Sequence, residues 1–194
     1  MGHRFYLLIV PVSAVGLIGT AIGLRQGSSE AGVAAMALAL AVGLACFIAA
    51  RTFRDRAAWM AGFLFGLSLA AGFLLGCLGW RASPASAIAA IVTLIVGAVA
   101  GRNLRRFLLV LYTPLWVAAW LLILGLIGAW MVDGDAGWTG PLAIVAGIVL
   151  AALSAAWFAR LPPDPQPVSA MDLYLLGLNL FLVIGVLQGE AALL

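Results

Sequence analysis

The side chains that can do chemistry are few in this 194-residue chain, and they lie almost entirely between long apolar segments. The single histidine, His3, stands at the N-terminal tip, so no apolar segment carries an imidazole that could bind haem or zinc or activate a nucleophile. The chain has no lysine, and nothing in it resembles a phosphate-binding Gly-Lys loop. We therefore predict that the protein is not an enzyme, with no catalytic residue, no cofactor and no metal site.

Composition indicates a membrane protein, because 65% of the residues are hydrophobic and 9% are charged, against about a quarter charged in soluble domains. A helix of about 20 apolar residues crosses the hydrocarbon core. Seven such segments fit between the charges, at residues 6–24, 31–50, 58–79, 85–101, 107–131, 140–159 and 171–189. The predicted fold is all-α, a single transmembrane helical domain over residues 1–194 with one leading helix and three helical hairpins.

Arginine placement predicts the orientation. The N-terminus and the breaks after the second, fourth and sixth spans hold eight of the ten basic residues, all arginine, and the opposite side holds two. By the positive-inside rule the N-terminus is cytoplasmic and the C-terminus lies outside. The proline-rich loop at 161–168 is then a stiff cytosolic segment, and we expect the protein in a bacterial inner membrane.

Two basic bends share a short pattern, since the R-x-x-R spacing of Arg51 and Arg54 returns at Arg102 and Arg105. The candidate basic residues are Arg51, Arg54, Arg56, Arg102, Arg105 and Arg106. The bends are short and lack interleaved aromatic residues, so anionic lipid headgroups suit them better than nucleic acid. Duplication of one hairpin would explain why the R-x-x-R spacing recurs. The alternative is that unrelated hairpins share it because each follows the positive-inside rule.

Small residues recur at helical spacing inside the spans. The G-x-x-x-G pairs are Gly62 with Gly66, Gly72 with Gly76, Gly97 with Gly101 and Gly185 with Gly189. Such pairs let helix backbones approach closely. We favour packing within the chain, and the alternative is a dimer interface.

An aromatic pair and a set of polar residues remain inside the spans. Trp116 and Trp120 lie one turn apart, where packing or lipid contact is favoured over stacking on a ligand. The mid-span polar residues are Ser13, Ser68, Thr93 and Asn179, with Asp172 on the face of Asn179. Interhelical hydrogen bonding is the favoured role of this set, and the alternative is a narrow path for a small solute or ion.

Two family resemblances are carried by short motifs. The segments GLACF at 43–47, RTFR at 51–54 and GFLFG at 62–66 resemble the seven-span family that includes transmembrane protein 198, which implies seven spans and a scaffold role. The segment LYLLGLNLFL at 173–182 resembles the last helix of the Bax-inhibitor-motif family, and TFRD at 52–55 is similar to its bend. Leu176 stands where that family has an acidic residue, so its pH-gated calcium leak is not implied here.

The expected function is that of a structural, accessory or scaffold subunit of a membrane assembly. The alternative is a passive channel or facilitator. No ionisable side chain lies deep in a predicted span, which argues against a proton-driven pump. Partners that co-purify stoichiometrically distinguish the subunit from a lone protein that conducts in liposomes.

Overall fold

The structure is a computed structural model, and it describes residues 5–28, 30–53, 55–80, 83–133, 139–162 and 165–188. A short π-helical turn, η1 (Phe5–Ile9), leads into the first α-helix. The α-helices are α1 (Val10–Gln26), α2 (Val33–Thr52), α3 (Ala57–Cys77), α4 (Pro84–Asn103), α5 (Arg105–Asp133), α6 (Thr139–Arg160) and α7 (Val168–Leu187). Over the described ranges seven helices are long and apolar enough to cross a membrane, which confirms the predicted spans.

Prolines and hydroxyl caps account for several helix ends. Ser83 caps α4 by accepting a hydrogen bond from the Ala85 amide at 3.0 Å, and Pro84 occupies the first helical position, where its missing N–H costs nothing. The described part of the proline-rich loop, residues 161, 162 and 165–167, is not helical. Proline cannot donate a helical hydrogen bond, and α7 begins directly after this loop at Val168.

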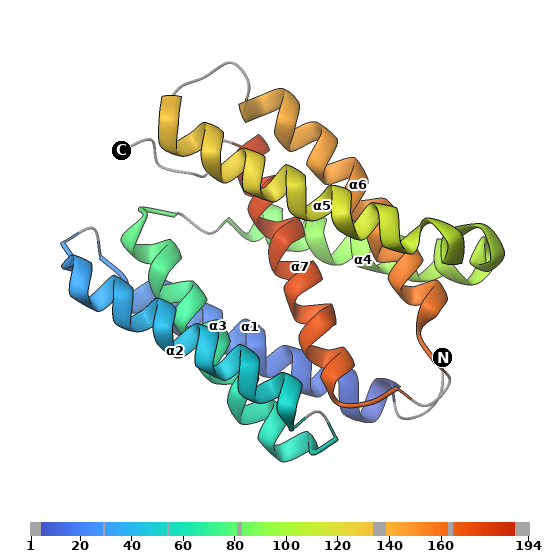
Figure 1. Cartoon of the computed structure of the whole chain (residues 1–194), viewed down its shortest axis with the longest axis horizontal. Helices are drawn as coiled ribbons and strands as arrows, with labels where there is room; N and C mark the ends of the chain where they lie inside the picture. Colours follow the sequence, from blue (N-terminus) through green and yellow to red (C-terminus); the bar gives the residue numbers. More distant parts are fainter. Residues whose placement is uncertain are drawn as a thin grey trace. The chain divides into compact units, whose positions relative to one another are not determined.

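The chain divides into two compact units. The first unit is Met1–Arg81 with Pro162–Leu175, and the second is Ala82–Leu161 with Leu176–Leu194. The first unit therefore holds α1, α2, α3 and the start of α7, whereas the second holds α4, α5, α6 and the rest of α7 (Figure 1).

In each unit the third helix packs against both others. In the first unit α3 contacts α1 most extensively and α2 next, and in the second unit α6 contacts α5 and α4. The consecutive helices α4 and α5 contact each other only slightly. The predicted hairpin of α2 and α3 is thus a packed pair, whereas the predicted hairpin of α4 and α5 is not, because α6 packs against both of them. Small-residue contacts, described below, bring α1 onto α3 and α4 onto α6.

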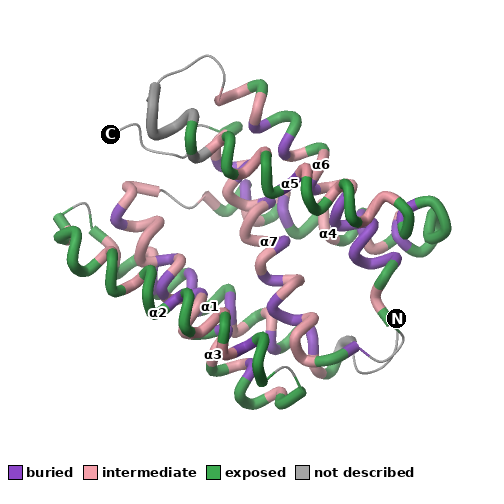
Figure 2. The backbone as a smooth tube through the Cα atoms, viewed as in Figure 1, coloured by how far each residue is buried: buried purple, intermediate pink, exposed green. Residues whose placement is uncertain are grey.

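Many large apolar residues are exposed, especially on α2, α4 and α5 (Figure 2). Val33 is 83% exposed and Val110 is 77% exposed. Apolar surface this extensive is rare on monomeric soluble proteins. It fits a chain whose helices contact lipid chains, in agreement with a multi-pass membrane protein.

Candidate functional site

The closest helix contact in the first unit is between glycines of α1 and a serine turn of α3. Ser68 Oγ occupies the place that a Cβ at Gly19 would take. One turn later, Gly23 lies against the Leu69 carbonyl oxygen and the Phe73 nitrogen. Ser68 is fully buried, and its hydroxyl donates to the Phe65 carbonyl at 2.9 Å, so the hydroxyl is satisfied within its own helix. Only glycine fits at these two positions of α1.

The second unit contains a contact of the same kind between α4 and α6. Ser154 Oγ occupies the place of a Cβ at Gly97. One turn later, a Cβ at Gly101 would lie 2.5 Å from the Ala155 carbonyl oxygen and 3.0 Å from the Ala159 nitrogen. Ser154 is fully buried and donates to the Ala151 carbonyl at 2.7 Å.

The two contacts agree residue by residue. In each unit a glycine of the first helix faces a serine of the third helix. A second glycine, four residues later, faces the carbonyl oxygen of the residue after that serine and the backbone nitrogen four residues beyond that carbonyl. Positions 19, 23, 68, 69 and 73 of the first unit correspond to 97, 101, 154, 155 and 159 of the second. Each serine also donates to the carbonyl three residues earlier. We call these two contacts the glycine–serine seams.

Of the predicted glycine pairs, Gly72, Gly76, Gly97 and Gly101 lie in these seams. A Cβ at Gly76 would come within 2.7 Å of the Leu24 carbonyl oxygen, and Gly72 lies against the Thr20 carbonyl. The α1 glycines that complete the first seam were not among the predicted pairs. Their spacing was a usable signal, because Gly16, Gly19, Gly23 and Gly27 recur every three or four residues along one face.

The remaining predicted glycines differ from one another. A Cβ at Gly66 would lie 2.6 Å from Cys46 Sγ, so Gly66 admits α2. Gly62 has no described atom within 4 Å of that position and lies in no helix contact. Gly185 is buried in α7, and Gly189 lies outside the described residues.

The start of α7 is bound to α1 by polar contacts. Ser13 Oγ lies 2.8 Å from the Ile9 carbonyl and 3.1 Å from the Ala170 carbonyl, to which it can donate. The hydroxyls of Thr20 and Tyr174 share a buried hydrogen bond of 2.7 Å. Gly16 makes room for the tyrosine ring, since a Cβ there would lie 2.5 Å from Tyr174 Cδ2.

Asp172 forms an ion pair with Arg51 of α2, in which Arg51 Nη2 lies 2.6 Å from Asp172 Oδ1. The two side chains are 47% and 31% exposed. The Arg51 guanidinium also lies over the Phe47 ring, 5.4 Å from its centroid. Asp172 thus contributes to an α2–α7 contact at the end of the span.

The four mid-span polar residues do not form one layer within either unit. Ser13 and Ser68 belong to the first unit, and Thr93 and Asn179 belong to the second. Ser13, Ser68 and Thr93 each donate to a carbonyl of their own helix, at 2.8 Å for Thr93 and Ala89. Asn179 is half-buried on α7. Inside each unit as described, no hydrogen bond joins two of these side chains.

The candidate arginines have separate surroundings. Arg105 Nε donates to the Ala159 carbonyl at 3.1 Å, at the end of the second glycine–serine seam. Arg56, Arg102 and Arg106 are exposed, and Arg54 lies outside the described residues. The second unit adds a contact that the sequence did not indicate, in which the Arg160 guanidinium lies 4.6 Å from the Tyr112 ring centroid.

The tryptophan pair of α5 lies on the surface. The rings of Trp116 and Trp120 have centroids 6.1 Å apart in an edge-to-face arrangement, and the residues are 48% and 47% exposed. This placement favours lipid contact and mutual packing over a buried ligand site.

Fold and side chains together define a multi-pass, α-helical membrane protein. Among the described residues no group of three His, Cys, Asp or Glu side chains is placed to hold a metal ion, and Cys46 and Cys77 are free. No family model, curated protein or solved structure matches the chain. The two family resemblances noted in the sequence stay predictions.

Proposed function

We propose that this protein is a passive facilitator, a channel or carrier for a small solute or ion, built from an inverted repeat. The observation that supports this function is the pair of glycine–serine seams, in which Gly19 with Ser68 and Gly97 with Ser154 occupy matching positions of two three-helix units. The support for this function therefore comes from the arrangement of the helices and not from a reactive side chain.

The membrane orientation of the repeats follows from the number of helices. Each unit contains three complete spans before α7. After an odd number of spans the chain lies on the side opposite to the one where it began. In this proposal α4 therefore enters the membrane from the side opposite to α1. Repeats of opposite orientation are a common framework of secondary transporters. With the arginine distribution, this proposal puts the start of α1 in the cytoplasm and the start of α4 outside.

The charges favour passive transport. The described ionisable residues of the spans lie near helix ends, as Arg51, Arg105 and Asp172 do. Coupling to protons normally requires a carboxylate or histidine within the membrane. A protein without one is suited to movement of a solute down its own gradient, without catalysis or a cofactor.

The accessory or scaffold role favoured by the sequence stays a prediction, together with membrane-protein partners, a homo-oligomer and a bacterial inner membrane. The hydroxyls of Ser13, Ser68 and Thr93 already bond to their own helices. The single proton of each hydroxyl is thus already used, and the proposed path does not depend on these residues.

The experiment combines gentle purification with flux measurement. The full chain is purified from its native membrane, its co-purifying proteins are quantified, and it is reconstituted into liposomes. Stopped-flow light scattering then measures entry of urea, glycerol and larger polyols, and ion-sensitive dyes measure monovalent ions. We expect faster entry of at least one small solute than in protein-free liposomes, with a size limit. Absence of flux for the whole panel, with stoichiometric partners present, contradicts the facilitator and supports the subunit.

A further inference from the structure

A depression on the surface of α3 lies at the end of the helix that follows the first basic bend. It has a volume of about 410 Å³ and is lined by Ala58, Trp59, Gly62 and Phe63. All four residues lie in the first two turns of α3. The depression is therefore a feature of one helix face within the first unit.

Gly62 explains why the surface is hollow at this point. No described atom lies within 4 Å of the place its Cβ would take, whereas Gly66, one turn on, has Cys46 Sγ within 2.6 Å of that place. The two glycines of this pair thus have different surroundings. Gly66 accommodates a neighbouring helix, and Gly62 leaves space that no described part of the chain fills.

Three aromatic rings border the depression. The ring centroids of Phe53 and Trp59 are 6.0 Å apart, and Phe63 lies 5.9 Å from each of them. Phe53 is 48% exposed and Trp59 is 54% exposed. The cluster presents a broad apolar wall beside Gly62, at the end of the span where tryptophan marks the membrane interface.

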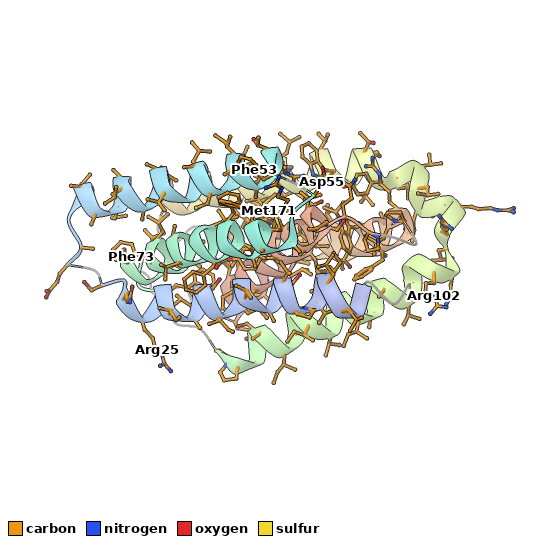
Figure 3. The ribbon with its side chains drawn as sticks, turned by 90° about the horizontal axis from the view of Figure 1, so that it is seen from below. Arg25, Phe53, Asp55, Phe73, Arg102 and Met171 are labelled. Atoms are coloured by element: carbon orange, nitrogen blue, oxygen red, sulfur yellow. The ribbon has the colours of Figure 1, made fainter. Side chains whose placement is uncertain are left out.

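Positive charge lies next to this wall. Figure 3 shows Phe53 and Asp55 at the bend between α2 and α3, and the exposed Arg56 directly precedes α3. Asp55 offsets part of this charge, and Asp172 offsets part of the charge of Arg51. The bend RTFRDR has three arginines and one aspartate, and Asp172 pairs with Arg51, so one net positive charge remains. A ligand that fits must join an anion at the bend to an apolar chain along α3.

We propose that this face binds an anionic phospholipid, with the net negative charge of its headgroup at Arg56 and one acyl chain in the depression over Gly62. Basic residues at the cytosolic interface attract acidic headgroups, and buried acyl methylenes add affinity. The other basic bend lacks such a wall among the described residues, since Phe107 is exposed and stacks on no other ring there. The proposal does not depend on transport by the protein.

Native mass spectrometry of the full chain in mild detergent tests this site. The purified protein is titrated with dioleoyl phosphatidylglycerol and, separately, with dioleoyl phosphatidylcholine, which carries the same chains. We expect the acidic lipid to bind about fivefold more tightly for the one arginine involved. Gly62→Leu fills the depression and should weaken the binding of both lipids about tenfold, the effect expected when roughly two acyl methylenes are no longer buried. Arg56→Gln should weaken only the acidic lipid, about fivefold.

Two matched variants control for general effects. Gly125 on α5 also has no described atom within 4 Å of its Cβ position, so Gly125→Leu adds the same side chain to an open helix surface elsewhere. Arg25→Gln removes an exposed arginine from the last turn of α1, outside either basic bend. Both should leave binding unchanged. Equal affinity of the two lipids for the unsubstituted protein, or full binding by Gly62→Leu with unchanged melting behaviour, overturns the proposal. So does an equal loss in Gly125→Leu.

Discussion

Ser68 Oγ fills the space that a side chain at Gly19 would need, and this contact joins α1 to α3. Gly97 and Ser154 repeat the relationship between α4 and α6. In lipid, helices gain little from the hydrophobic effect when they associate, so close van der Waals packing at small residues decides which helices pair. The two seams therefore explain why α1 and α4 pack on the third helix of their own unit.

Gly97→Ala should lower the free energy of unfolding by about 1–3 kcal/mol, the usual cost of forcing an extra methyl into a packed contact. The new Cβ meets Ser154 Oγ and lies 3.1 Å from Ser154 Cβ and 3.2 Å from the Ala155 nitrogen. Thermal unfolding in detergent, followed by circular dichroism, measures the loss. Gly19→Ala should behave in the same way.

Removal of the serine hydroxyl gives a stricter version of this test. Ser154→Ala should recover at least half of the stability lost in Gly97→Ala, because the closest opposing atom is removed. Ser68→Ala should not rescue Gly97→Ala, although it should rescue Gly19→Ala. Gly125→Ala, at an open surface, should be neutral. If Gly97→Ala and Gly125→Ala melt at the same temperature, the seam is not a tight contact.

Tyr174→Phe should cost about 0.6 kcal/mol, the average for hydrogen bonds between membrane helices. The substitution removes the hydroxyl that bonds to Thr20 at 2.7 Å and keeps the ring over Gly16. Thr20 retains its bond to the Gly16 carbonyl at 3.0 Å, so no unsatisfied hydroxyl remains. A double-mutant cycle with Thr20→Val measures the interaction. Strictly additive losses would show that the two hydroxyls do not act together.

Asp172→Asn should change stability by less than about 1 kcal/mol, and the change should shrink as salt is added. The pair with Arg51 is short at 2.6 Å, but its side chains are 47% and 31% exposed, so water screens their attraction. Melting temperatures of the variant and of Arg51→Gln, each at low and high salt, provide the measurement. A salt-independent loss of several kcal/mol would indicate a buried pair instead.

Apolar segment length was sufficient to predict the seven spans, because crossing hydrocarbon requires a satisfied helical backbone of a minimum length. Helix partners were not predictable in this way. Spacing identifies the small residues of a helix but not the atoms that face them. Gly62 and Gly66 form one G-x-x-x-G pair in the sequence, although only Gly66 has a described atom close to its Cβ position.

Polar residues show a similar limit. Ser13, Ser68 and Thr93 drew attention by their depth, yet each is satisfied by a carbonyl of its own helix, a bond that hydropathy does not reveal. Ser154 was missed because a single serine near a helix end is common. It could have been found only by aligning the two halves of the chain on Gly19 and Gly97, since their partners Ser68 and Ser154 also correspond.

The inverted repeat proposed above predicts a labelling pattern for four single cysteines. The background carries Cys46→Ala and Cys77→Ala. Cysteine then replaces one residue at a time. Ser28 and Leu104 each follow the first helix of a unit, and Thr52 and Thr139 each lie at the connection between the second and third helices of a unit. A membrane-impermeant maleimide is applied to intact spheroplasts and then to permeabilised ones. We expect Ser28→Cys and Thr139→Cys to react in both preparations, and Thr52→Cys and Leu104→Cys to react only after permeabilisation.

The comparison of Ser28→Cys with Leu104→Cys is decisive, because each position follows the first helix of its unit and the proposal puts the two on opposite sides. The three complete spans of each unit require this reversal, and the arginines at 51–56 and 102–106 favour the cytoplasm for both of those bends. Reaction of Ser28→Cys and Leu104→Cys from the same side means that one helix does not cross the membrane. The units then share an orientation, and the inverted repeat fails independently of any flux measurement.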